Sequence, residues 1–430
     1  MQLTKKNRTI LSVFLLLYYI YMNSVRKVMI PMDTIVVPVM LAVVMGITLY
    51  DSKGKIVVKG TSDILQCASW SIIAVYIVVN NQAVFANLIS KGMIQLFVMI
   101  VFMLCSPRER IWVKKWISYT EVFVGIHALA TIIFFFNSSL YKLFVRIFYA
   151  SSASTLLYYY NKGWMCGLSS HFSSNGMILA IGVAVFFEDI RNLKNQQITH
   201  RKRWWLYICA FATLYALILS SKRGPLIAIT LSIIITYIFA QGKDVGKRLI
   251  ILFAICVLLI VAYRVVLQSI PGMETIINKF NALEDSDAGI LNGRSGLWSR
   301  ALEMFNENPI FGGGFGSYAT YAVQTGAITT SAHNYYLQVL AELGIVGLVL
   351  YAMAFISGIC NAFRQLKVAT QNKDDKSTIT WLSIALEVEL FVIFYSMTST
   401  AMMYYTILIP YFLACTAVRT ISNTADFSGE

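Results

Sequence analysis

One of the four histidines in this chain has a setting suited to acid–base chemistry. His333 begins the stretch HNYYLQVLAELGIVG, at the start of a long apolar run. The positive end of a helix dipole disfavours imidazolium there, and a general base requires neutral imidazole. Asn334 beside it can hydrogen-bond a sugar or orient the ring. Gly344 and Gly347 lie on one helix face and predict close packing of a neighbouring helix. A cap-region histidine above a packing glycine pair remains the structural alternative.

Two arginines have the chemistry of phosphate binding. Arg223 lies in SSKRGP, a tight turn between two apolar runs, and Arg294 lies in NGRSGLW. A guanidinium group is the natural bidentate partner of phosphate oxygens. Lys222 and Arg300 are candidate helpers. Taken singly, each of these cations could instead extend toward lipid head groups or water, so their arrangement matters more than any one of them.

The other histidines are weaker candidates. His171 follows GLSS at the start of an apolar run, where it could face a substrate path. His127 lies within an apolar run and favours a packed, hydrogen-bonded histidine, whereas His200 lies in a basic segment and should be solvated. The seven cysteines lie mostly in apolar runs without CxxC spacing. They are expected to be small hydrophobic residues, with no disulfide framework and no metal cluster.

The elements that must position these residues are apolar helices. Of the 430 residues, 57% are hydrophobic and only 13% are charged, against about 25% charged in soluble proteins. This composition predicts one all-α integral membrane domain over residues 1–430 and argues against an ordinary soluble enzyme. Runs long enough to span a bilayer predict about twelve transmembrane helices. They cover residues 9–23, 28–50, 62–80, 92–105, 116–136, 172–189, 204–220, 225–241, 249–267, 334–357, 379–397 and 400–418.

The net charge of +14 suggests nucleic acid at first sight, but the distribution of basic residues favours a membrane. With a cytoplasmic N-terminus, 23 of the 35 Lys and Arg residues lie on the cytoplasmic side, as the positive-inside rule requires. Both termini are then cytoplasmic. His171, Arg223, Arg294 and His333 all fall on the extracytoplasmic side, and no nucleic-acid partner is expected.

A long extracytoplasmic segment, 268–332, precedes the tenth run. Residues 295–307 place Leu297, Trp298, Ala301, Leu302 and Phe305 on one face, which predicts an amphipathic helix. The sequence FGGGFG at 311–316 lacks the GxGxxG spacing of a nucleotide loop and indicates backbone that approaches another surface.

Carboxylates within the apolar runs keep a second class of function open. Glu121, Glu387 and Glu389 lie within or near predicted spans. Ionisable groups inside membranes are candidates for function because their burial is costly. A transporter or flippase of polysaccharide precursors is therefore the alternative from another class.

Together these motifs resemble the bacterial O-antigen ligase and polymerase superfamily. The pattern of His333-Asn334, nine residues, then Gly344 and Gly347 is similar to its signature. GRSGLWSRALEMFNENPIFGGGFGSY (293–318) and SSKRG resemble its upstream blocks, and GLSSHFSSNG (167–176) resembles a further segment weakly. The resemblance is clearest over about 220–350, which we take as the catalytic region.

The resemblance implies a metal-independent glycosyltransferase without cofactors, similar in fold to other integral-membrane glycosyltransferases of the GT-C type. Its donor would be a glycan on undecaprenyl diphosphate, and it would act at the outer face of a bacterial cytoplasmic membrane. His333 would be the base that activates the acceptor hydroxyl, and Arg223 and Arg294 would hold the departing diphosphate. A polymerase of O-antigen, capsule or exopolysaccharide is expected, with a chain-length regulator as a partner. A ligase that acts on lipid A-core or protein is the alternative.

Overall fold

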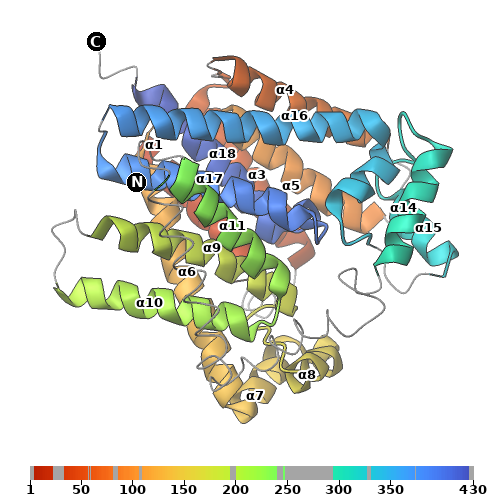
Figure 1. Cartoon of the computed structure of the whole chain (residues 1–430), viewed down its shortest axis with the longest axis horizontal. Helices are drawn as coiled ribbons and strands as arrows, with labels where there is room; N and C mark the ends of the chain where they lie inside the picture. Colours follow the sequence, from red (N-terminus) through yellow and green to blue (C-terminus); the bar gives the residue numbers. More distant parts are fainter. Residues whose placement is uncertain are drawn as a thin grey trace.

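The computed structural model shows an all-helical protein (Figure 1). It describes residues 4–22, 33–56, 58, 60–80, 86–105, 109–193, 200–239, 246, 294–326, 331–372 and 374–425. Within these ranges the regular elements are helices, which confirms the predicted fold class. The predicted ninth span, 249–267, and residues 268–293 and 327–330 of the predicted extracytoplasmic segment lie outside the described residues.

Long helices coincide with the other eleven predicted spans. They are α1 (Lys5–Tyr21), α3 (Asp33–Ser52), α4 (Gly60–Val79), α5 (Ala86–Leu104), α6 (Ile111–Phe136), α9 (Phe172–Asn192), α10 (His200–Leu219), α11 (Arg223–Phe239), α16 (Tyr335–Gln371), α17 (Lys376–Ser396) and α18 (Tyr405–Ala425). Six of them, α4, α6, α9, α16, α17 and α18, are long and apolar enough to cross a membrane by length and composition. The chain is thus an integral membrane protein, and the number of twelve spans stays a prediction.

The packing of these helices distinguishes a centre from a periphery. Helices α9, α17 and α18 are the most enclosed of the long apolar helices, and α18 lies with 89% of its apolar stretch buried. Helices such as α4 and α6 instead keep apolar side chains exposed, among them Val75 and Leu129. An apolar outer surface around a buried core is what a bilayer solvent favours, because lipid tails are as apolar as the side chains.

Several short helices connect or precede the long helices of the bundle. Helices α7 (Ser138–Phe148) and α8 (Ala153–Asn161), joined by η1 (Ala150–Ser152), lie between α6 and α9. Helices α14 (Ser295–Glu307) and α15 (Ser317–Gln324) lie beside the N-terminal end of α16 (Figure 1), and η5 (Ala401–Met403) precedes α18. The amphipathic helix predicted at 295–307 is confirmed as α14. Its buried side chains are Ala301 and Met304, whereas Leu302 is exposed, so the predicted face is slightly rotated.

Helix α16 is interrupted at Gly344. This residue has φ 65° and ψ −166°, a conformation that is essentially restricted to glycine. The break leaves backbone groups without helical partners, and the segment 309–314 supplies replacements. Gly313 N–H donates to Ala341 O at 2.9 Å, Gly314 N–H donates to Glu342 O at 2.8 Å, and Ile345 N–H donates to Pro309 O at 2.9 Å. The glycine-rich FGGGFG stretch is therefore backbone that pairs with a broken helix.

The expectation that a neighbouring helix packs on the glycine pair is wrong. A Cβ atom on Gly344 would lie 2.3 Å from Ile310 O, so the close approach is made by a loop. A Cβ atom on Gly347 would lie 2.2 Å from Leu343 Cβ, because the break at Gly344 crowds the chain there. Helix α4 reinforces the junction, since Asn80 Nδ2 donates to Phe311 O at 2.8 Å and the Tyr76 hydroxyl lies 2.8 Å from the same oxygen.

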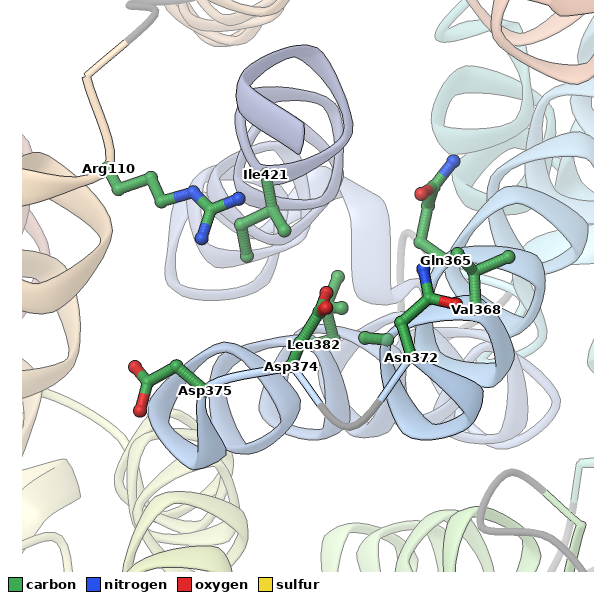
Figure 2. A pocket seen from close by; sticks show the side chains of 9 residues that line it. Arg110, Gln365, Val368, Asn372, Asp374, Asp375, Leu382 and Ile421 are labelled. Carbon is green, nitrogen blue, oxygen red and sulfur yellow. The ribbon is translucent and has the colours of Figure 1, made fainter. Parts of the chain in front are cut away.

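A cavity of about 270 Å³ lies at the opposite end of α16, where the chain turns into α17. Figure 2 shows the Arg110 side chain on one side and Gln365, Val368 and Asn372 on the other. Because His333 precedes the first residue of α16 and this cavity surrounds the last, the two lie at different ends of the longest helix. The cavity is therefore separate from the residues that the sequence singles out.

Replacing Gly344 with Ala should destabilise the protein. Alanine would have to adopt a strained φ, at about 1–3 kcal/mol, and its methyl group would displace the 309–314 segment. The control is Gly125→Ala in α6, where a Cβ atom meets nothing within 4 Å and the change should stay within about 1 kcal/mol. Thermal unfolding in detergent measures both variants. Equal melting temperatures would contradict the role given to Gly344.

Candidate functional site

The residues singled out by the sequence lie mostly at helix ends, and the structure brings five of them together. His171 is the N-cap of α9, Lys222 and Arg223 join α10 to α11, Arg294 is the N-cap of α14, and His333 comes two residues before α16. Electrostatic interactions link the five side chains pairwise: Lys222 and His333 act on His171, Arg294 and Lys222 act on His333, and Arg223 acts on Lys222 and Arg294, so they lie close in space. We call these five residues the charged cluster.

The turn that carries Lys222 and Arg223 has a strained backbone. Ser221 has φ 53°, which is unfavourable for a residue with a Cβ atom. Its hydroxyl donates to Gly163 O at 3.0 Å, so the segment after α8 holds the turn in place. Helix α9 approaches closely from the other side, because a Cβ atom on Gly176 would lie 3.2 Å from Lys222 Cβ. Strain that the surroundings maintain is frequent at functional sites.

His333 is held in the same kind of conformation, with φ 51°. Its backbone N–H donates to Ser331 Oγ at 3.2 Å, and that oxygen lies 3.1 Å from Thr400 Oγ1. Asn334 follows as the N-cap of α16, and its Oδ1 accepts from Tyr336 N–H at 3.1 Å and Leu337 N–H at 3.2 Å. The side-chain oxygen of Asn334 therefore caps the helix. Contact of Asn334 with a sugar stays a prediction.

Both imidazole rings in the cluster are neutral at pH 7. Burial lowers the pKa of His333 to about 4, with further lowering by the positive charges of Arg294 and Lys222. Burial also lowers the pKa of His171 to about 4, helped by Lys222 and His333. The expected neutral base therefore agrees with the structure, but burial and neighbouring cations are the causes, and the helix dipole is not needed. His171 Nδ1 accepts from Ser173 N–H at 3.0 Å, which leaves Nε2 as the protonated nitrogen.

The cations of the cluster are partly desolvated and face one another. Burial, followed by the charges of Arg294 and Arg223, lowers the pKa of Lys222 to about 8. Burial is also the main cause that lowers the pKa of Arg294, whose Nη1 donates to Thr398 O at 3.1 Å. Like charges held close in a poorly solvated place repel one another. Such an arrangement fits a ligand that carries several negative charges, and a diphosphate is the simplest biological example.

The comparison with known families agrees with this geometry. Residues 208–352 match the family model described as O-antigen ligase. This match confirms the resemblance to the O-antigen ligase and polymerase superfamily that the motifs predict. Curated proteins offer no match to the chain. We call the matched residues 208–352 the O-antigen ligase region, after the family model. It includes Lys222, Arg223, Arg294 and His333, whereas His171 precedes it and joins the cluster only through the fold.

Arg300 is a predicted site residue whose hydrogen bonds lie outside the charged cluster. Its Nε donates to Thr325 Oγ1 at 2.9 Å, its Nη2 donates to Thr325 O at 3.1 Å, and its Nη1 donates to Gly296 O at 3.0 Å. The two bonds to Thr325 tie α14 to the end of α15. The guanidinium group therefore supports the O-antigen ligase region structurally, and substrate binding by Arg300 stays a prediction.

Glu342 is a structural residue of this region that sequence reasoning missed. Its buried carboxylate accepts from Gly316 N–H at 2.9 Å and from Gln338 Nε2 at 2.9 Å. Gln338 Oε1 in turn accepts from Ala332 N–H at 3.3 Å, next to His333. This chain of bonds connects the loop before α15 to the backbone beside the histidine. An acidic residue within the apolar run HNYYLQVLAELG was the available signal.

Other residues give no support to a metal site. Among the described residues, there is no group of three or more His, Cys, Asp and Glu side chains that could hold a metal ion. His127 Nε2 lies 2.6 Å from Tyr21 O, which confirms that this histidine is packed and hydrogen-bonded.

Binding of inorganic diphosphate to the purified protein should weaken as the pH rises through 8. Lys222 carries its charge below its pKa of about 8 and loses it above, so affinity should fall about tenfold between pH 7 and pH 9. Lys222→Arg keeps the charge at both pH values and controls for titration of the ligand. Isothermal titration calorimetry on both proteins checks this. A wild-type affinity that follows that of Lys222→Arg across the pH range would exclude Lys222 as the cause.

Proposed function

We propose that this protein polymerises lipid-linked oligosaccharide repeat units into a surface polysaccharide at the outer face of a bacterial cytoplasmic membrane. The observation that carries the proposal is the charged cluster, which places Lys222, Arg223 and Arg294 beside neutral His333 within the O-antigen ligase region. The donor is a glycan on undecaprenyl diphosphate, and the acceptor is a sugar hydroxyl of a second lipid-linked unit.

In this reaction each group of the cluster has one task. His333 takes the proton of the acceptor hydroxyl while its oxygen attacks the anomeric carbon of the donor sugar. The bond between that carbon and the diphosphate oxygen breaks, and undecaprenyl diphosphate leaves with the electron pair. Arg223, Arg294 and Lys222 stabilise its growing negative charge, which is the largest kind of catalytic contribution in such sites. His171, as a neutral donor through Nε2, can hydrogen-bond the diphosphate or a sugar hydroxyl.

A ligase that transfers the finished glycan to lipid A-core or protein is the closest alternative. It would use the same donor and the same cluster, because only the acceptor differs. Polymerisation is preferred on the ground that surface-polysaccharide polymerases do not require an outer membrane. A polysaccharide chain-length regulator is the partner that a polymerase would have.

The buried carboxylates that favour a transporter lie among packed side chains, which is consistent with a structural role. Glu387 is fully buried and lies close to Glu188, which pairs with Arg191. Glu389 is buried next to Cys415, and its Oε2 would lie 2.9 Å from a Cβ atom on Gly358. Two neighbouring carboxyl groups with an arginine beside them can have a structural role at the junction of α9 and α17 without moving a substrate.

Replacing His333 with Ala should abolish polymer formation. Loss of a positioned general base reduces the rate by about 10²–10⁴-fold. The measurement is the chain-length ladder of the surface polysaccharide in cells that carry the variant. His127→Ala, which removes a buried histidine outside the cluster, controls for loss of a histidine as such. A normal ladder from normally expressed His333→Ala would remove His333 from the mechanism.

The diphosphate-binding role predicts a graded series of cation variants. Arg223→Ala and Arg294→Ala should each lower turnover about 10²–10³-fold, as removal of a donor to developing charge does. Lys222→Ala should leave partial activity. Arg300→Ala serves as the comparison, because its bonds to Thr325 lie outside the cluster. Transfer of glycan between synthetic undecaprenyl diphosphate substrates in nanodiscs measures the series, and equal effects of all four changes would contradict the assignment.

The transporter alternative predicts a different result for the carboxylates. Under the polymerase proposal, Glu389→Gln should keep the polysaccharide ladder, because the amide keeps the shape of the buried side chain. Under the transporter alternative, Glu387→Gln and Glu389→Gln should abolish movement of lipid-linked units in proteoliposomes while His333→Ala has no effect. Measuring both glycan transfer and movement across the bilayer for the three variants separates the two classes.

A further inference from the structure

A group of aromatic side chains adjoins the charged cluster. It consists of Tyr158 and Tyr159 at the end of α8, Trp164 in the segment that follows, and Phe172 at the start of α9. Trp164 stacks on Tyr159 at 5.9 Å between ring centroids, with 30° between the planes. Phe172 lies 5.0 Å from both of these rings. We call these four residues the aromatic corner, and nothing in the proposed mechanism uses them.

The two outer rings of the aromatic corner, Tyr158 and Trp164, are nearly perpendicular. Tyr158 and Trp164 stand at 88° to each other with centroids 6.3 Å apart. Tyr158 is 54% exposed, and Trp164 is partly exposed. Two partly exposed rings at a right angle therefore present apolar surface in two directions. Packing against Tyr159 holds Trp164 so that this surface is formed in advance.

The backbone joins the aromatic corner to the charged cluster. Trp164 N–H donates to Tyr159 O at 2.9 Å, Met165 N–H donates to Leu219 O at 3.1 Å, and Ser221 Oγ donates to Gly163 O at 3.0 Å. The residues on either side of Trp164 are thus bonded to the turn that carries Lys222 and Arg223. A ligand that contacts both features would find them at a fixed separation.

Ring contacts give a second connection. His171 stacks on Phe172 at 4.4 Å and meets Tyr159 edge-on at 5.1 Å. Lys222 Nζ lies 5.1 Å from the centroid of the Phe172 ring. Two members of the cluster therefore contact the aromatic corner directly. Moving outward from His171, the chain of contacts passes through Tyr159 to Trp164 and then to exposed Tyr158.

We propose that the aromatic corner binds a sugar ring of the glycan whose reacting end lies in the charged cluster. A sugar ring offers apolar C–H faces that stack on aromatic rings, and its hydroxyls point sideways to polar partners. Tyrosine and tryptophan suit this ligand because each combines a large apolar face with a polar tip. The proposal rests on the proposed function, since it names where a unit of that glycan is held.

The surroundings favour a sugar over the polyprenyl chain of the substrate. Asn161 and Lys162 next to Tyr158 are exposed, and Lys162 Nζ lies 5.9 Å from the centroid of the Tyr158 ring. A site for a hydrocarbon chain would be expected to have an apolar rim, because burying an amide or ammonium group against lipid is costly. An exposed amide and ammonium beside the ring instead offer partners for sugar hydroxyls.

The test measures binding of glycan and of lipid carrier separately, on the full chain in nanodiscs. The glycan probe is the repeat-unit oligosaccharide that mild acid releases from the lipid-linked repeat unit of the host bacterium, and the lipid probe is undecaprenyl diphosphate. Trp164→Ala should weaken oligosaccharide binding about tenfold, by loss of one stacking partner, and Trp164→Phe should restore most of it. Affinity for undecaprenyl diphosphate should be unchanged in both.

A matched control is available on α10. Trp204 is 66% exposed and meets Tyr207 at 6.3 Å and 73°, a pair similar in geometry to Trp164 and Tyr158 but located in the first turns of that helix. Trp204→Ala should leave oligosaccharide binding at the wild-type level. Should Trp164→Ala fail to fold, Tyr158→Ala carries the test, because its exposed side chain contributes less to packing.

The other possible results of these binding measurements overturn either the proposal or the proposed function. Unchanged oligosaccharide binding in Trp164→Ala or Tyr158→Ala overturns the proposal, as does weakened binding of undecaprenyl diphosphate, which would assign the rings to the lipid chain. An equal loss in Trp204→Ala overturns it as well. If the wild-type protein binds the oligosaccharide through Trp164 and yet transfers no glycan, that result would contradict the proposed function but support sugar binding by the aromatic corner.

Discussion

The break in α16 is the constraint from which the rest of the arrangement follows. Backbone N–H and C=O groups that lose helical partners inside a membrane protein cost several kcal/mol each unless another segment pairs with them. Here Pro309, Ile310, Gly313 and Gly314 provide that pairing around Gly344. The pairing fixes the segment that carries α14 against the helix that His333 precedes. It thereby sets the position of Arg294 relative to the histidine, and Glu342 strengthens the same junction through Gly316.

The charged cluster is, by contrast, unfavourable for stability. Lys222, Arg223 and Arg294 repel one another in a poorly solvated place, and Ser221 and His333 keep strained backbone conformations beside them. Well-packed neighbours such as α9 and the segment after α8 maintain this arrangement. Features that lower stability and are held in place by their surroundings indicate a binding or catalytic task. An anionic ligand would relieve the repulsion.

The matched region, the charged cluster and the aromatic corner together make up one candidate site, because they share residues or contact one another. The match covers His333, which we propose as the base, and Lys222, Arg223 and Arg294, which we propose as the cations that bind diphosphate. His171 and the rings of Tyr158, Tyr159 and Trp164 come from the part of the chain before it, so the complete site uses residues on both sides of the match's first residue. Under the proposed function, the cations would bind the diphosphate that all substrates share, and the aromatic rings would contact the sugars that differ between glycans. Glu387 and Glu389, in turn, are buried among packed helices.

The amino-acid pattern by itself determined the all-helical membrane fold, the positions of most helices, and the residue types that could bind diphosphate or act as a base. Those properties depend on local composition and on spacing along one helix, which are readable without the fold. Tertiary structure alone decided that His171 joins His333 and Lys222, that Arg300 supports α15, and that Gly344 receives a loop where a helix was expected. Nothing in the spacing of HNYYLQVLAELGIVG distinguishes a continuous helix with small residues from one that breaks. The difference lies in whether a distant segment supplies hydrogen bonds to the freed backbone, and only the folded chain brings residues 309–314 to that place.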